Sequence, residues 1–172
     1  MKKSILLLLV VLSTTFSCQQ SNEETMQQVG FEINKDGSKT ALVAGDLSSV
    51  AVWEKYIQAH NERDLQTIAA LNSSNFKAYG PRGEFIDGTA AHIEFLKNWF
   101  GEANPRWSSK FLIANAFKDK EGKTQQWVTS GHDLKLTVNE ETVEVVQIHD
   151  ALIVDGKVKM FNVYERVKSE KE

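Results

Sequence analysis

Two adjacent polar residues, His149 and Asp150, interrupt an apolar, β-branched run that ends at the turn signal Asp155-Gly156. An imidazole can take up or release a proton near neutral pH, and a carboxyl group in an apolar site can stay protonated and donate a hydrogen bond. Successive residues of a strand point to opposite faces of its sheet, so only one of the two can face an interior. The pair is not expected to bind a metal, since no third ligand has suitable spacing.

The alternation of side chains predicts which of the two points inward. Even-numbered positions are predominantly apolar in both 125–138 and 142–154. A loop slightly longer than two residues would place Val138 opposite Thr142 and keep these apolar faces together. Asp150 then points inward, and a bulge near Gly131 would invert the assignment. In this register His132 also points inward, and the outward set is Asp133, Lys135, Gln147 and His149.

Further candidates lie on an expected helix that Asp46, Ser48 or Ser49 can cap and that runs to about Glu62. Its apolar face has helical spacing and consists of Trp53, Tyr56, Ile57 and His60. A second short helix is expected from Asp64 to about Leu71, and a third from Thr89 to about Gly101. Four long strands are expected after them, at 106–118, 125–138, 142–154 and 157–167. Helices followed by an antiparallel meander predict an α+β fold, with long strands curling around a helix into a cone.

The segments WEKYIQAHNERDLQTIAAL, FxxxGPxGxxIxG and HDxxxxxDGKV, in this order, resemble the nuclear transport factor 2-like superfamily. Within it the pattern is similar to the polyketide-cyclase-like (SnoaL-like) and ketosteroid-isomerase-like branches. The resemblance covers about 50–167 and implies a cone-shaped (cystatin-like) α+β fold, with three N-terminal helices in a curved, mixed and mostly antiparallel sheet. Because this fold hosts isomerases, cyclases, dehydratases and binding modules, it does not define an activity.

The resemblance also implies roles for individual residues. Asp150 stands where the isomerase-like branch has an aspartic acid that donates to a substrate oxyanion, and Tyr56 stands where it has the partner tyrosine. The general base of that branch is an aspartate just before a proline, and Gly80 takes this position here. A replacement base would be His60, His92 or His132; sharing a face with Tyr56 favours His60, and sharing one with Asp150 favours His132.

Each of these residues also has a purely structural interpretation. Buried Asp–His or Asp–Tyr hydrogen bonds are common in protein cores, and His60 near a helix end can be an ordinary partly exposed residue. Three tryptophans are candidates to line an apolar ligand pocket, although core or interface packing is the more common role of such residues: Trp53, Trp99 and Trp107. No cofactor is expected, because the chain has no phosphate loop, nucleophile elbow or cysteine pair.

The N-terminal residues have the pattern of a secretory signal over 1–17, with Lys2 and Lys3 before an apolar run. Cys18 follows directly, is the only cysteine, and resembles the lipidation site of bacterial lipoproteins. The alternative is a plain secretory signal with an incidental cysteine. We expect a membrane-anchored protein, periplasmic or at the cell surface, with a tether over 18–45 that includes a small hairpin, a domain over 46–168, and a tail over 169–172.

The charge balance excludes one class of partner. Loss of Lys2 and Lys3 with the signal would reduce the 20 basic residues to 18, against 23 acidic residues. An acidic chain without a basic run is not expected to bind nucleic acid. The sequence therefore predicts an exported protein of the cyclase/isomerase-like type that binds a small molecule or is weakly catalytic. The alternative is a non-enzymatic module that binds a partner or forms a homodimer through the outer sheet face.

Overall fold

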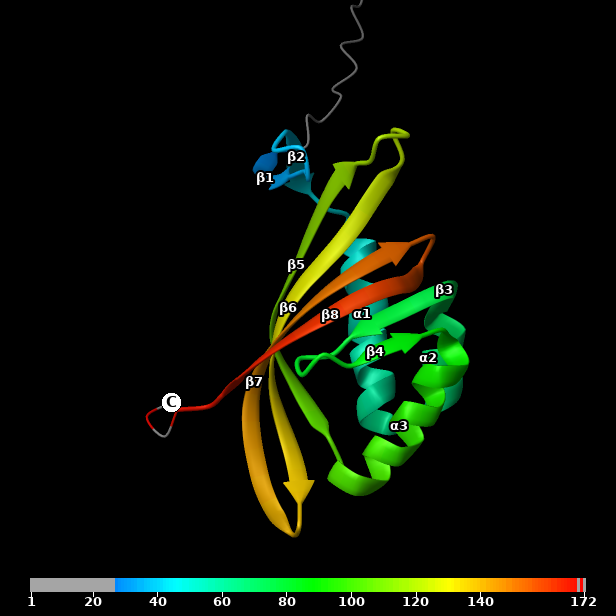
Figure 1. Ribbon diagram of the computed structural model, residues 1–172, viewed down its shortest axis with the longest axis vertical. Helices are drawn as coiled ribbons and strands as arrows, with labels where there is room; N and C mark the ends of the chain where they lie inside the picture. Colours follow the sequence, from blue (N-terminus) through cyan, green and yellow to red (C-terminus); the bar gives the residue numbers. More distant parts are fainter. Residues whose placement is uncertain (1–26, 170, 172) are drawn as a thin grey trace, which may run out of the picture.

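The computed structural model describes residues 27–169 and residue 171. The predicted signal, tether start and Cys18 lie outside these residues. Three helices lie on one face of a strongly twisted sheet (Figure 1). They are α1 (Leu47–Glu62), α2 (Leu65–Leu71) and α3 (Thr89–Ala103). The described residues contain no helix long and apolar enough to cross a membrane.

Eight strands form the sheet, in the order β1-β2-β5-β6-β7-β8-β3-β4. Their bounds are β1 Gln28–Ile33, β2 Lys39–Ala44, β3 Asn72–Tyr79, β4 Phe85–Asp87, β5 Arg106–Lys118, β6 Thr124–Val138, β7 Glu141–Val154 and β8 Lys157–Val167. Every neighbouring pair is antiparallel except β3 and β8, which are parallel. The predicted α+β class and the mixed, mostly antiparallel sheet are therefore confirmed. The hairpin β1–β2 joins the sheet edge through β5.

The helices begin where the sequence offers side-chain caps. Asp46 accepts a hydrogen bond from the Ser48 backbone N–H at 2.8 Å, and Asp64 accepts one from Thr67 at 2.9 Å. Both carboxylates satisfy amide groups that the first helical turn leaves unpaired. The helices pack onto the sheet through a buried core that includes Trp53, Ile68 and Leu96.

The turn between β6 and β7 has two residues, which corrects the predicted register. Asn139 and Glu140 both have positive φ, 51° and 66°, as a type I′ hairpin turn requires. Val138 therefore pairs with Glu141, and not with Thr142. The shift of one residue turns every side chain of β7 to the face opposite to the predicted one.

Asp150 consequently points away from the helices, and His149 points toward them. Asp150 pairs with Thr129, whose hydroxyl donates a hydrogen bond to it at 2.8 Å, on the outer face of the sheet. His132 faces inward as predicted, and Asp133 faces outward, but Gln147 and His149 belong to the inner face. The prediction failed because β7 is apolar on both faces, so alternation alone could not select the register.

Candidate functional site

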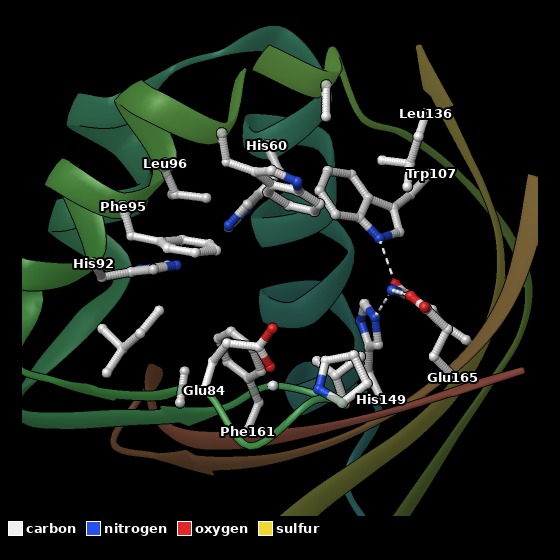
Figure 2. A pocket seen from close by; sticks show the side chains of 18 of the residues that line it. His60, Glu84, His92, Phe95, Leu96, Trp107, Leu136, His149, Phe161 and Glu165 are labelled. Atoms are coloured by element: carbon white, nitrogen blue, oxygen red, sulfur yellow. Dashed lines mark hydrogen bonds between the residues drawn. The ribbon is translucent and has the colours of Figure 1, made fainter. Parts of the chain in front are cut away.

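A cavity of about 500 Å³ lies between the helices and the inner face of the sheet. Its wall is predominantly aromatic and aliphatic, and its polar atoms come from a small number of side chains, as is usual for small-molecule sites. The aromatic residues that line it are Trp53, Tyr56, Phe95, Trp99, Trp107 and Phe161. Thus the three tryptophans considered from the sequence all line the cavity. Figure 2 shows His60, His92 and His149 on different sides of it.

Gln147 determines which nitrogen of the neutral His149 ring carries the proton. The Trp107 indole can only donate, and its Nε1–H lies 3.0 Å from Gln147 Oε1. The same oxygen lies 2.9 Å from His149 Nε2, so this nitrogen must carry a proton and donate as well. Gln147 Nε2 in turn donates to Glu165 Oε2 at 2.8 Å. The remaining nitrogen, His149 Nδ1, is a bare acceptor.

No described residue donates to His149 Nδ1, which is the only buried side-chain nitrogen or oxygen without a partner among residues 27–169 and 171. Burial, followed by the nearby His132 and His60, lowers the pKa of His149 well below its usual value. An unpaired buried acceptor costs about 1–3 kcal/mol, and such atoms concentrate at functional sites. Position 149 was assigned to the outer face from the sequence, so this feature was missed.

His60 has the opposite ring orientation. Its Nδ1 lies 2.7 Å from the backbone oxygen of Tyr56, which can only accept, so Nδ1 carries the proton. Nε2 is therefore a bare acceptor, and none of the described residues hydrogen bonds to it. His60 Nε2 is not one of the fully buried atoms that lack a hydrogen-bond partner, so it retains some accessible surface. Because His60 lines the cavity, we infer that this lone pair faces the cavity. Burial is the main reason that the pKa of His60 falls to about 4, so the ring stays neutral near pH 7.

Tyr56 and His92 form a buried cluster beside His60. The Tyr56 hydroxyl donates to Asn72 Oδ1 at 2.6 Å, and His92 Nδ1 lies 3.3 Å from the same hydroxyl oxygen. Burial raises the pKa of Tyr56 well above its usual value, and burial also lowers the pKa of His92 to about 3. Because the Tyr56 proton is already used within the protein, this hydroxyl is not free to donate to a ligand.

His132 lies on the inner face but does not line the cavity. Ser130 Oγ accepts from Trp53 Nε1 at 2.9 Å and lies 2.8 Å from His132 Nε2, while Ser109 Oγ lies 3.1 Å from His132 Nδ1. Both ring nitrogens are therefore engaged within the core. The structure separates the four predicted catalytic residues: His60 and Tyr56 line the cavity, His132 lies behind Trp53 and His149, and Asp150 lies on the other side of the sheet.

A carboxylate that the sequence analysis missed lies at the cavity mouth. The Glu84 side chain occupies the space into which a side chain at Gly80 would project, and its Oε2 accepts the Arg82 backbone N–H at 2.8 Å. Figure 2 shows Glu84 on the same side of the cavity as Phe161. Glu84 thus puts a carboxyl group beside the position where the isomerase-like branch has its base. The sequence feature that could have revealed this contact is the spacing of Gly80 and Glu84, which lie on either side of one tight turn.

The described residues contain no group of three or more His, Cys, Asp or Glu side chains that could hold a metal ion. His60 and His92 are neighbours, with ring centres 5.6 Å apart, but no carboxylate or third imidazole joins them. The side chains of the cavity offer hydrogen bonding and proton transfer, by neutral imidazoles and by carboxylates such as Glu84.

Comparison with solved structures identifies the fold. A protein assigned as a ketosteroid isomerase from Kribbella flavida matches with a TM-score of 0.58 and 18% identity, over 74% of this chain and 84% of its own. An LEH-like epoxide hydrolase from M. tuberculosis matches with a TM-score of 0.58 and 15% identity, over 69% and 83%. A protein assigned as a SnoaL-like polyketide cyclase from Jannaschia matches with a TM-score of 0.55 and 12% identity, over 70% and 86%.

The chain therefore has the nuclear transport factor 2-like fold, as its sequence motifs predicted. No protein-family model matches the sequence. No curated protein matches it either. At these identities the structural similarity establishes the fold alone, and the activity has to be argued from the cavity itself.

Proposed function

We propose that this protein binds a small, largely apolar molecule in the cavity between its helices and sheet. The observation that carries the proposal is an aromatic-walled cavity of about 500 Å³ that contains an open imidazole lone pair, on His60. A cavity of this volume is within the usual range for small-molecule sites. The similar solved structures include enzymes that the same fold adapts to isomerase, cyclase and epoxide hydrolase chemistry, which supports this kind of site.

Proton transfer in the cavity would be weak. His60 Nε2 is the open base, but its pKa of about 4 makes it a poor proton acceptor near neutral pH. Tyr56 and Asp150 do not complete an oxyanion site, because Tyr56 donates to Asn72 and Asp150 faces outward. The arrangement therefore fits binding better than rapid turnover, with cyclase- or isomerase-like proton transfer as a secondary activity.

Titration of the protein with biphenyl, an apolar probe without hydrogen-bonding groups, tests this proposal. Because Trp53, Trp99 and Trp107 line the cavity, occupancy is expected to change tryptophan fluorescence in a saturable way. A one-to-one isotherm in the micromolar range would support the site. A fluorescence change that rises linearly with no saturation, or no change at all, would count against it.

The outer face of the sheet favours a second candidate function, that of a dimerisation surface. Phe111, Ile113 and Tyr164 lie there and are 42%, 56% and 61% exposed. Phe111 and Tyr164 lie in one cross-strand row with Ile148, and Ile113 lies in a neighbouring row with Asp150. This exposed apolar patch differs from the polar surface predicted from sequence, since Gln147 and His149 face inward. Light scattering should show a dimer that Ile113→Lys weakens at least tenfold; a monomer at high concentration would exclude this candidate.

The location of the protein is proposed from its sequence. Lys2, Lys3 and the apolar run that follows support export, and Cys18 supports attachment of lipid at a periplasmic or cell-surface membrane. Growth of expressing bacteria with labelled fatty acid should label the full chain and leave Cys18→Ser unlabelled. Equal labelling of both chains would contradict lipidation at Cys18.

A further inference from the structure

Several of the hydrogen-bond donors that line the cavity are already used within the protein, whereas one acceptor, on His60, is open. His60 Nε2 is bare, because its Nδ1 proton is committed to the Tyr56 carbonyl. Gln147 Oε1 already receives two hydrogen bonds, and one Gln147 amide proton is donated to Glu165. The Tyr56 hydroxyl proton goes to Asn72. The indole protons of Trp53 and Trp107 are also used, by Ser130 and Gln147. Trp99 also lines the cavity, and no described residue accepts a hydrogen bond from its indole N–H. The open polar group whose role is fixed by its own hydrogen bond is the acceptor on His60.

The charged residues at the cavity are mainly acidic. Glu84, Glu102 and Glu165 line it, and Arg82 is the one cationic residue among the lining side chains. Arg82 lies 3.3 Å from Glu165, so its charge is already paired with a carboxylate. An anionic ligand would meet three carboxylates against one arginine, and would also lose its hydration in an apolar interior. The cavity therefore disfavours carboxylates and phosphates.

Resting on the proposed function, we infer that the cavity selects uncharged ligands whose polar group is a hydrogen-bond donor, a hydroxyl above all, and that His60 Nε2 receives that hydrogen bond. His149 Nδ1, on the sheet side, is a second bare acceptor, but it is fully buried, so we assign the ligand contact to His60. The ring of His60 is held in place by Tyr56, 4.6 Å away between ring centres, and by Trp107, 5.8 Å away. A rigid acceptor of this kind discriminates well between a donor and its isostere.

Three probes of one shape separate the inference from the proposed function. Biphenyl-4-ol can donate, 4-methoxybiphenyl can only accept, and biphenyl-4-carboxylate carries a negative charge. We expect biphenyl-4-ol to bind at least tenfold more tightly than the methoxy compound, and the carboxylate to bind most weakly. Equal binding of the alcohol and the ether would overturn the inference and leave the proposed function standing. If biphenyl binds and none of the three does, the inference alone is overturned; if biphenyl fails to bind as well, both are overturned.

The variant His60→Phe tests the assigned residue, because it keeps an aromatic ring and removes the lone pair. The preference for biphenyl-4-ol over 4-methoxybiphenyl should fall to about twofold or less. Asp150→Asn, on the outer face of the sheet, is the control and should keep the full preference. If His60→Phe does not fold, nitrogen NMR of the wild-type protein decides: biphenyl-4-ol should shift the His60 Nε2 resonance and 4-methoxybiphenyl should not. An equal shift with both probes, or a preference retained in a folded His60→Phe, would contradict the assignment.

Discussion

Lowering the pH from 7.5 to 5.5 should remove about 5–6 kcal/mol of the folding stability of the domain. All four histidines of the chain are buried and neutral in the fold: His60, His92, His132 and His149. Burial is the largest cause of their lowered pKa values, which are about 4 for His60, about 3 for His92 and about 4 for His132, with His149 also well below its usual value. An unfolded chain would titrate these rings near pH 6.5.

The direction of this pH effect follows from the difference in proton binding between the folded and unfolded states. Above pH 6.5 neither state binds protons at these rings, and the full stability is present. As the pH falls below 6.5, the unfolded chain takes up protons that the folded protein refuses, so stability is lost until the folded pKa values near 3 to 4 are reached. Each ring contributes about 1.4 kcal/mol per pH unit, and four rings together contribute about 5–6 kcal/mol by pH 5.5. Small domains are stabilised by about 5–15 kcal/mol in total.

Urea unfolding at a series of pH values from 7.5 to 5.0 measures this slope. The carboxylates whose pKa the fold lowers, such as Asp64 and Glu144, act only at lower pH, so the histidines dominate this window. His132→Gln removes one ring that does not line the cavity and should reduce the slope by about one quarter. A free energy of unfolding that stays constant between pH 7.5 and 5.0 would contradict the buried, neutral state of these side chains.

The variant Val163→Trp should abolish binding of biphenyl while the fold is retained. Val163 lines the cavity and pairs with His149 across β7 and β8. An indole at this position would occupy the space that a ligand needs, and the cavity has room for the added volume. We expect affinity to fall at least 100-fold, with little change in the free energy of unfolding, because a filled cavity gains packing contacts.

The neighbouring residue supplies a matched control. Tyr164 lies on the outer face, 61% exposed, so Tyr164→Trp introduces the same indole one position along the strand without entering the cavity. Its affinity for biphenyl should equal that of the unchanged protein. Retained binding in Val163→Trp, or equal losses in both variants, would place the ligand somewhere other than the cavity.

Much of the fold could be predicted from the sequence because its signals are local. Asp46 and Asp64 are capping residues at the starts of α1 and α2. The side chains of Trp53, Tyr56 and His60 recur at helical spacing. The turn at Asp155-Gly156 ends β7, as predicted. These features depend on neighbours within a few residues, and the structure reproduces them.

The candidate site could be predicted only in part because it depends on register. Asn139 and Glu140 form a tight turn with positive φ, although Glu seldom adopts this conformation, and β7 has apolar residues on both faces. A shift of one residue exchanged Asp150 for His149 at the inner face. The open nitrogen of His60 and the carboxylate of Glu84 depend on hydrogen bonds to Tyr56 and Arg82, which spacing alone does not reveal.

The most direct test of a small-molecule site is to locate the bound probe by amide NMR of the labelled full chain with biphenyl-4-ol. The account predicts that the largest shifts occur at cavity-lining residues such as His60, Phe161 and Val163. Residues of the outer face, such as Thr129 and Tyr164, should change little. Shifts confined to the outer face, or none at saturating probe, would contradict the account and direct attention to the exposed sheet surface.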